Sequence, residues 1–106
     1  MIPMDIEGLR KKIDELDAQL VELLNQRANC ASEIGKLKSR MQMPIYEPRR
    51  EQVIFDNVRR HNQGPLPDAE LVGIYERIID VMRKIQKEEI VPEQPLSGES
   101  ELEDND

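Results

Sequence analysis

The chain of 106 residues has few aromatic side chains: Phe, Trp and Tyr together make up 3% of it, and Trp is absent. So few large side chains argue against a large compact core in a monomer. Cys30 is its one cysteine, which excludes a disulfide bond within the chain and is expected to be a buried, unreactive thiol. The sequence has no apolar run of about 18 residues, as a membrane span requires, and no basic region followed by an apolar run, as in a signal peptide. We therefore expect a soluble cytoplasmic protein.

Basic residues are absent from the end of the chain. The formal net charge is −7, but eight of the 22 acidic residues follow Lys87, after which no basic residue occurs. Residues 1–87 are therefore almost neutral, and no basic patch of the kind that binds nucleic acids stands out. Pro, Ser, Gly and acidic residues dominate from Pro92 onward, which is typical of disorder. We expect one helical domain over residues 1–91 and an acidic disordered tail over residues 92–106.

The sequence does contain a long apolar repeat with the three- and four-residue spacing of a helix face. Asp5 is a suitable N-cap before this repeat, and Pro44 disfavours helical geometry at Met43, so a helix is expected over about residues 6–41. Gly35 inside this helix indicates close packing of another helix. The repeat consists of Ile6, Leu9, Ile13, Leu16, Leu20, Leu23, Arg27, Cys30, Ile34, Leu37 and Met41.

Two shorter helices are expected after a brief connection. Pro48, a favoured first-turn residue, opens a helix that ends near Asn62. A proline-containing loop follows, and the third helix begins near Asp68 and fades around Ile90. The alternation typical of strands does not occur. The predicted fold class is therefore all-α, with a subunit of three helices of which the first is very long.

Arg27 is the one charged member of the apolar repeat. A buried cation is costly unless an anion meets it. Lys38 lies eleven residues later on nearly the same side of the helix, about 16 Å along the axis, so the two side chains can bracket a small dianion. Alternatively, Arg27 reaches solvent or pairs with a carboxylate, and Arg10 and Lys38 are ordinary solvated residues.

The first helix is about 55 Å long and cannot be covered by the rest of one chain. Its apolar face therefore calls for a second copy. In an intertwined antiparallel homodimer with its two-fold axis near residues 20–24, Arg10 of one chain faces Arg27 and Lys38 of the other. Arg10 lies about 25 Å from Arg27 along its own helix and cannot reach the same small ligand from there, whereas the antiparallel dimer brings the three cations together. The dimer then has two identical sites.

With these residues in hand, the chain resembles the all-helical class of chorismate mutases over about residues 5–90. The stretches that carry the resemblance are residues 9–17, 23–27 with 34–38, 44–51 and 78–86, in order and at the family's spacing. The resemblance implies an intertwined dimer with two shared active sites. It also implies isomerisation of chorismate to prephenate, a step of aromatic amino acid biosynthesis, by an intramolecular Claisen rearrangement.

The resemblance also implies roles for the cationic residues. Arg10 of the partner chain and Arg27 are expected to bind the two carboxylates of the substrate. Lys38 is expected to contact a carboxylate and the ether oxygen, and Gln86 to donate a hydrogen bond to that oxygen. Lys38, Gln86 and Arg27 are thus the expected catalytic residues.

The remaining site residues follow from the same resemblance. Glu51 is expected to hold the ring hydroxyl, helped by the backbone at Glu47, where the family usually has Asp. Met82 stands where the family often has Ser, so a hydrogen bond to a substrate carboxylate is expected to be missing. Arg50 belongs to the motif without an assigned role.

The implied reaction needs no cofactor or metal, and we expect neither. The sequence has no metal-ligand cluster, no Ser/His/Asp set and no phosphate-binding loop. Two alternatives remain at this point. One is an isochorismate–pyruvate lyase, which shares the fold and the cationic pocket, and the other is a non-catalytic helical dimerisation module.

Overall fold

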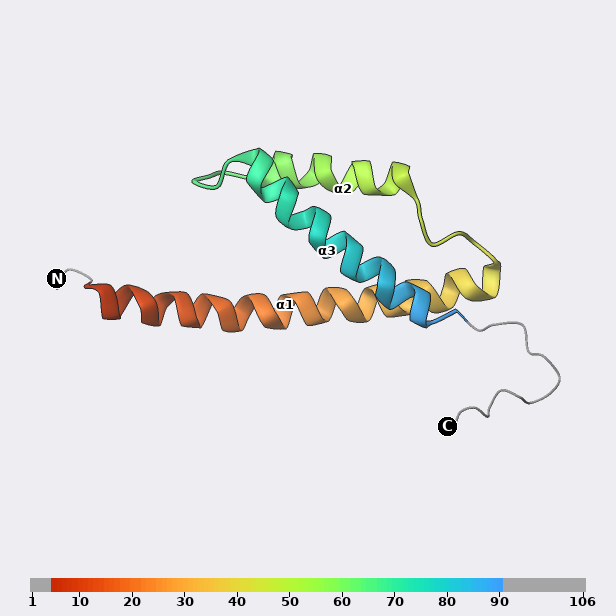
Figure 1. Ribbon diagram of the computed structural model, residues 1–106, viewed down its shortest axis with the longest axis horizontal. Helices are drawn as coiled ribbons and strands as arrows, with labels where there is room; N and C mark the ends of the chain where they lie inside the picture. Colours follow the sequence, from red (N-terminus) through yellow and green to blue (C-terminus); the bar gives the residue numbers. More distant parts are fainter. Residues whose placement is uncertain (1–4, 91–106) are drawn as a thin grey trace, which may run out of the picture.

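The computed structural model describes residues 5–90, which form three α-helices and no strand (Figure 1). The helices are α1 (Ile6–Met41), α2 (Pro48–His61) and α3 (Asp68–Glu88). The predicted all-α class and the order of the three helices are confirmed. None of the helices in this part of the chain combines the length and the apolar character needed to cross a lipid bilayer. The acidic tail predicted for residues 92–106 lies outside the described residues.

Local signals in the sequence account for both ends of α1. The carboxylate of Asp5 accepts a hydrogen bond from the backbone N–H of Gly8 at 2.8 Å, as expected of an N-cap. At the other end Gln42 has a left-handed backbone (φ 55°), and the N–H of Met43 donates to the carbonyl of Lys38 at 2.9 Å. Lys38 therefore lies in the last turn of α1, next to the loop that leads to α2.

An asparagine organises the connection between α2 and α3. Asn62 Nδ2 donates to the carbonyl of Leu66 at 2.8 Å and to the carboxylate of Asp68 at 2.6 Å. Its Oδ1 accepts from the N–H of Gly64 at 3.0 Å, and Gly64 has a φ of +76°, which glycine adopts without strain. These bonds close α2 and α3 into a hairpin.

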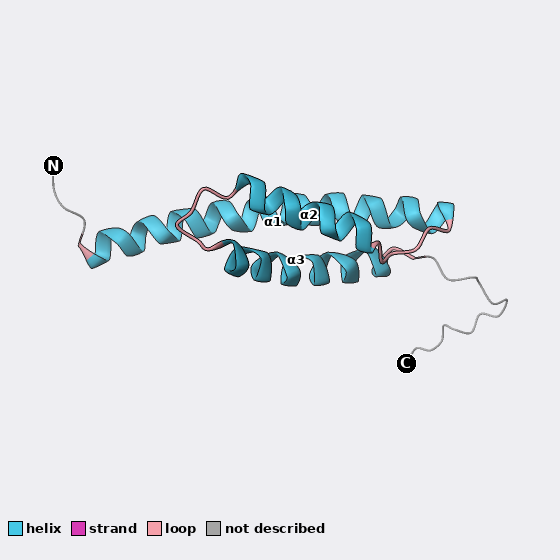
Figure 2. Ribbon diagram, turned by 90° about the horizontal axis from the view of Figure 1, so that it is seen from above, coloured by secondary structure: helices cyan, strands magenta, loops and turns pink. Residues whose placement is uncertain are grey.

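The third helix, α3, packs against both α1 and α2 and crosses the C-terminal half of α1 (Figure 1, Figure 2). The side of α1 that it contacts carries Ala31, Gly35 and Lys38, all of which are buried. A Cβ atom at Gly35 would lie 2.8 Å from both the Cα and the carbonyl oxygen of Gln86. The close packing predicted at Gly35 is therefore confirmed, and it brings Lys38 beside α3.

The apolar repeat of α1 is not covered within one chain. Leu9 and Leu23 keep 50% and 60% of their surface exposed, and the N-terminal part of α1 extends beyond α2 and α3 (Figure 1). Among the described residues, the buried apolar side chains are those of Ala31, Ile79 and Met82. The radius of gyration is 19.6 Å, against about 13 Å for a compact domain of 100 residues. One chain thus leaves a long apolar face open.

Candidate active site

A cavity of about 470 Å³ lies among the C-terminal half of α1, the loop after it, α2 and α3. Its lining contains six of the seven residues that the sequence analysis assigned to the site, although they come from four different parts of the chain. They are Arg27 and Lys38 of α1, Glu47 of the loop, Glu51 of α2, and Met82 and Gln86 of α3.

Lys38 is the most buried charge of the cavity, with 6% of its surface exposed. Its Nζ lies 2.8 Å from Oε1 of Glu47, 3.0 Å from the carbonyl oxygen of Ile45 and 3.0 Å from Oε1 of Gln86. An ammonium group has three donors, so all of them are used inside the chain. The alternative of a solvated Lys38 is therefore wrong. The side chain of Glu47 takes part in the site, whereas the sequence analysis expected only its backbone.

Gln86 is held in place from two sides. Its backbone abuts Gly35, and its Oε1 accepts the hydrogen bond from Lys38. Within residues 5–90 no acceptor is bonded to its Nε2. The amide can therefore donate a hydrogen bond to an oxygen atom that enters the cavity.

Glu51 is paired with an arginine that the sequence analysis did not assign. Arg83 Nε donates to Oε2 of Glu51 at 2.9 Å, and both residues line the cavity. Arg83 follows Ile79 and Met82 and precedes Gln86 on one face of α3, at helical spacing. That spacing is the signal by which the sequence could have indicated Arg83.

Arg27 lines this cavity and also an adjoining one, and Arg50 lines both as well. In the described part of the chain no carboxylate forms an ion pair with Arg27. The alternative in which Arg27 pairs with a carboxylate is therefore wrong as far as the carboxylates of residues 5–90 are concerned. Its guanidinium remains able to bind an anion.

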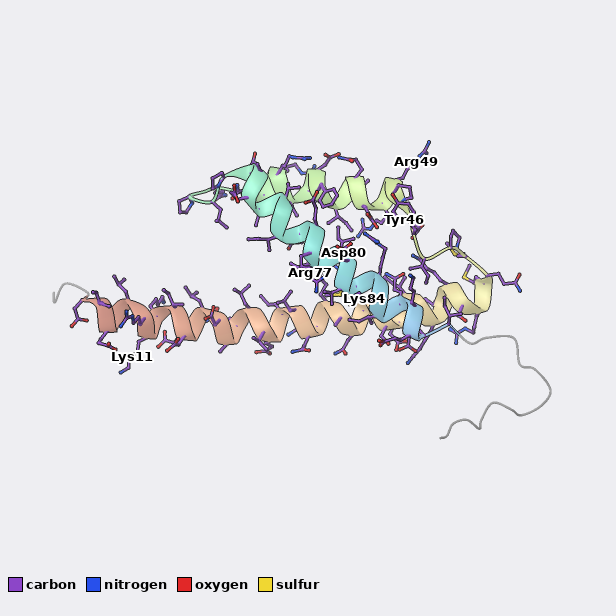
Figure 3. All side chains as sticks on the ribbon, in the orientation of Figure 1. Lys11, Tyr46, Arg49, Arg77, Asp80 and Lys84 are labelled. Atoms are coloured by element: carbon purple, nitrogen blue, oxygen red, sulfur yellow. The ribbon has the colours of Figure 1, made fainter. Side chains whose placement is uncertain are left out.

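Arg10 is not part of the cavity of its own chain. It is exposed and lies 3.5 Å from Glu7. Figure 3 shows its neighbour Lys11 on the part of α1 that extends beyond α2 and α3. About 25 Å of helix separates Arg10 from Arg27, so only a second chain can bring it to the site.

Two further residues, Met82 and Cys30, line the cavity. Met82 is buried at the cavity wall and offers no hydrogen-bond donor, as its side chain implies. Cys30 was expected to be buried but is exposed in the single chain. Cys30 instead lines the cavity.

The charges of the cavity indicate its ligand class. Positive groups outnumber carboxylates, and the His, Cys, Asp and Glu side chains among residues 5–90 form no group of three that could hold a metal ion. A concave site with a surplus of positive charge suits a small anion. The charged lining residues are Arg27, Lys38, Arg50, Arg83, Glu47 and Glu51.

Fold and site together define an all-helical protein with a cation-rich cavity for a small anionic molecule. The sequence model of chorismate mutase type II matches residues 9–87, and the chain belongs to this family. This confirms the resemblance to the family that the sequence showed.

The share of a relative's length that this chain matches differs from one known relative to another. The bifunctional chorismate mutase/prephenate dehydratase of Aquifex aeolicus is 39% identical over 87 residues, which are 78% of this chain and 24% of that protein. The chorismate mutase of Methanocaldococcus jannaschii is 30% identical over 81 residues, or 76% of this chain and 82% of that one. The chain thus spans about a quarter of the bifunctional relative and most of the shorter one.

A solved structure agrees with the fold. The crystal structure of chorismate mutase from Helicobacter pylori in complex with prephenate superimposes with a TM-score of 0.73 at 34% identity. The match covers 79% of this chain and 91% of that one. The three-helix arrangement is therefore shared with a chorismate mutase over nearly its whole length.

Proposed function

We propose that this chain isomerises chorismate to prephenate by an intramolecular Claisen rearrangement. The observation that carries the proposal is the contact between Lys38 and Gln86 in the cavity, with 3.0 Å between Nζ and Oε1. Lys38 supplies a buried positive charge, and Gln86 supplies an N–H donor from another helix. The Helicobacter pylori relative supports the proposal, because a protein of the same fold was solved in complex with prephenate.

The chemistry suits these two groups. The rearrangement breaks one bond and forms another within the same molecule, so no external nucleophile is needed. The site has to hold the flexible enolpyruvyl arm over the ring, and orientation of this kind contributes several kcal/mol. It also has to stabilise the negative charge that grows on the ether oxygen, for which a preorganised donor contributes about 3 kcal/mol. Lys38 and Gln86 are the proposed donors.

The substrate's carboxylates are assigned to arginines. Arg27 is proposed to bind one of them, since no described carboxylate already pairs with it. Arg10 of a second chain is proposed to bind the other. Met82 offers no donor where the resemblance leads one to expect Ser, so we expect weaker binding than in relatives that have the Ser hydroxyl.

The ring hydroxyl is assigned to Glu51, with the backbone at Glu47 as a second contact. Oε2 of Glu51 is used by Arg83, whereas Oε1 has no donor in the described part of the chain. A hydroxyl group can donate a hydrogen bond to this second oxygen. The carboxylate thus suits a neutral donor on the ring.

A homodimer with two shared sites completes the proposal. The uncovered apolar face of α1 and the distance of Arg10 from its own cavity both support it. An antiparallel pair with its axis near residues 20–24 covers that face and brings Arg10 to the partner's site. Light scattering is expected to give about twice the chain mass of 12.3 kDa, and a monomer would contradict this part of the proposal. A cytoplasmic location is proposed on the sequence alone.

The experiment that tests the function is incubation of the purified protein with chorismate, followed by identification of the product. Formation of prephenate supports the proposal. Release of pyruvate from isochorismate, without conversion of chorismate, would assign the lyase activity instead. No turnover of either substrate by a well-folded dimer would indicate a dimerisation module that lacks the chemistry.

A further inference from the structure

Arg83 lines the cavity but has no part in the reaction described above. Its Nε donates to Oε2 of Glu51 at 2.9 Å, and its Nη2 donates to Oδ1 of Asp80 at 2.8 Å. The ring of Tyr46 lies over the guanidinium, with 5.5 Å between Cζ and the ring centroid. Figure 3 shows Tyr46 at the end of the loop before α2 and Asp80 on α3. Contacts from two helices and a loop therefore hold the guanidinium in one position.

This arrangement determines the charge environment of Glu51, which is bonded to Arg83. Its side chain is only 17% exposed, and a carboxylate with little access to water is costly unless a cation pairs with it. Arg83 supplies that cation and binds one of the two oxygens. The other oxygen, Oε1, accepts from no residue in the described range and remains available for a ligand.

We infer that Arg83 is a positioning residue that acts through Glu51 and makes the site prefer a neutral hydroxyl group to an ammonium group on the substrate ring. This inference rests on the proposed function, in which Glu51 contacts the ring hydroxyl. The guanidinium compensates the charge of the carboxylate, so an ammonium gains little attraction from Glu51 and is repelled by Arg83. A hydroxyl donates one hydrogen bond to Oε1 and meets no repulsion.

A double-mutant cycle tests whether Arg83 acts through Glu51. Arg83→Met and Glu51→Gln are each expected to lower kcat/KM for chorismate, on the order of tenfold. The double variant is expected to be no worse than Glu51→Gln alone, because the partner of Arg83 is already lost. Losses that multiply would show that Arg83 contacts the substrate itself and would overturn the inference, as would full activity of Arg83→Met.

Matched variants separate this role from effects on folding. Arg83→Lys keeps the cation and is expected to recover part of the activity. Arg59→Met removes another i,i+3 ion pair, with Asp56 at 3.1 Å, outside the cavity and is expected to leave kcat/KM unchanged. Circular dichroism and thermal unfolding verify each fold. Arg83→Gln replaces Arg83→Met in the cycle if the latter does not fold.

The preference for one substrate over another distinguishes the proposed role of Arg83 from a purely structural one. A purely structural role would leave this selectivity unchanged. Each protein is assayed with chorismate and with the analogue that has an amino group in place of the ring hydroxyl. Arg83→Met is expected to shift the ratio of the two kcat/KM values toward the amino analogue by about tenfold. An unchanged ratio would overturn the inference.

Turnover of chorismate by the unaltered protein is measured first, because it tests the proposed function separately. If the protein does not turn over chorismate, the four proteins of the cycle are titrated with prephenate by calorimetry. A loss of affinity in Arg83→Met that is absent in the Glu51→Gln background would then support the role of Arg83. Additive losses, or no binding by any of the four proteins, would overturn it.

Discussion

The ammonium nitrogen of Lys38 lies 2.8 Å from a carboxylate oxygen of Glu47, so the buried cation of the cavity is paired before a ligand enters. The two other acceptors of Lys38 are a backbone carbonyl and the amide of Gln86. Glu47 is the charged one of the three acceptors, and its side chain is 38% exposed, so water can solvate it when it leaves Lys38. A substrate carboxylate that binds Lys38 therefore displaces Glu47 most easily.

Glu47→Gln is expected to lower KM for chorismate about two- to fivefold, with little change in kcat. A change of this size corresponds roughly to the free energy of a partly exposed ion pair. The reason is that the neutral amide competes less well than a carboxylate for Lys38. Steady-state kinetics measure this effect. Glu33→Gln is the control, because it makes the same charge change at an exposed pair with Lys36, 3.1 Å long and outside the cavity. A higher KM in Glu47→Gln would show that Glu47 assists binding.

Gly35→Ala is expected to destabilise the protein by about 1–3 kcal/mol and to lower kcat/KM at least tenfold. The new Cβ would lie 2.8 Å from backbone atoms of Gln86, so α3 has to move and the contact between Gln86 and Lys38 is lost. Denaturant unfolding and kinetics measure the two effects.

Gly73→Ala is the matched control for that substitution. A Cβ at Gly73 meets no atom within 4 Å, and Gly73 lies inside α3. This variant is expected to be more stable by about 0.5–1 kcal/mol and fully active. Equal effects of the two substitutions would mean that packing at Gly35 does not position Gln86.

Arg27→Leu is expected to fold and to lose activity by a factor on the order of 100 or more. Folding is retained because no ion pair within the described residues is broken and the apolar repeat becomes continuous. Thermal unfolding measures whether the variant is folded, and kcat/KM for chorismate measures the loss of activity. Arg40→Leu, on an exposed position of α1 outside the cavity, serves as the control. Wild-type turnover in Arg27→Leu would show that Arg27 does not bind the substrate.

Mixed dimers of Arg10→Ala and Arg27→Leu chains test the shared sites. Each variant alone is expected to be nearly inactive. After the two are unfolded together and refolded, about half of the dimers are mixed, and each of these has one site with both arginines intact. About a quarter of wild-type activity is therefore expected. No recovery would mean that Arg10 and Arg27 serve the same chain or that Arg10 has no role.

The sequence alone determined the helices, because their signals are local. The N-cap at Asp5, the proline at the start of α2 and the spacing of apolar residues act over a few positions, and the structure follows them closely. Arg27 was recognisable for the same reason, since a charge inside an apolar repeat stands out without knowledge of the fold. The family motifs added Glu51 and Gln86, which no local rule singles out.

Only the tertiary structure decided how the charged groups are paired. Lys38 meets the amide of Gln86, and Glu51 meets Arg83, across pairs of elements that are distant in the sequence. Those contacts depend on where α3 crosses α1, which the absence of a side chain at Gly35 permits. Helix periodicity specifies which residues share a face but not which faces meet, because packing energy arises from non-local contacts.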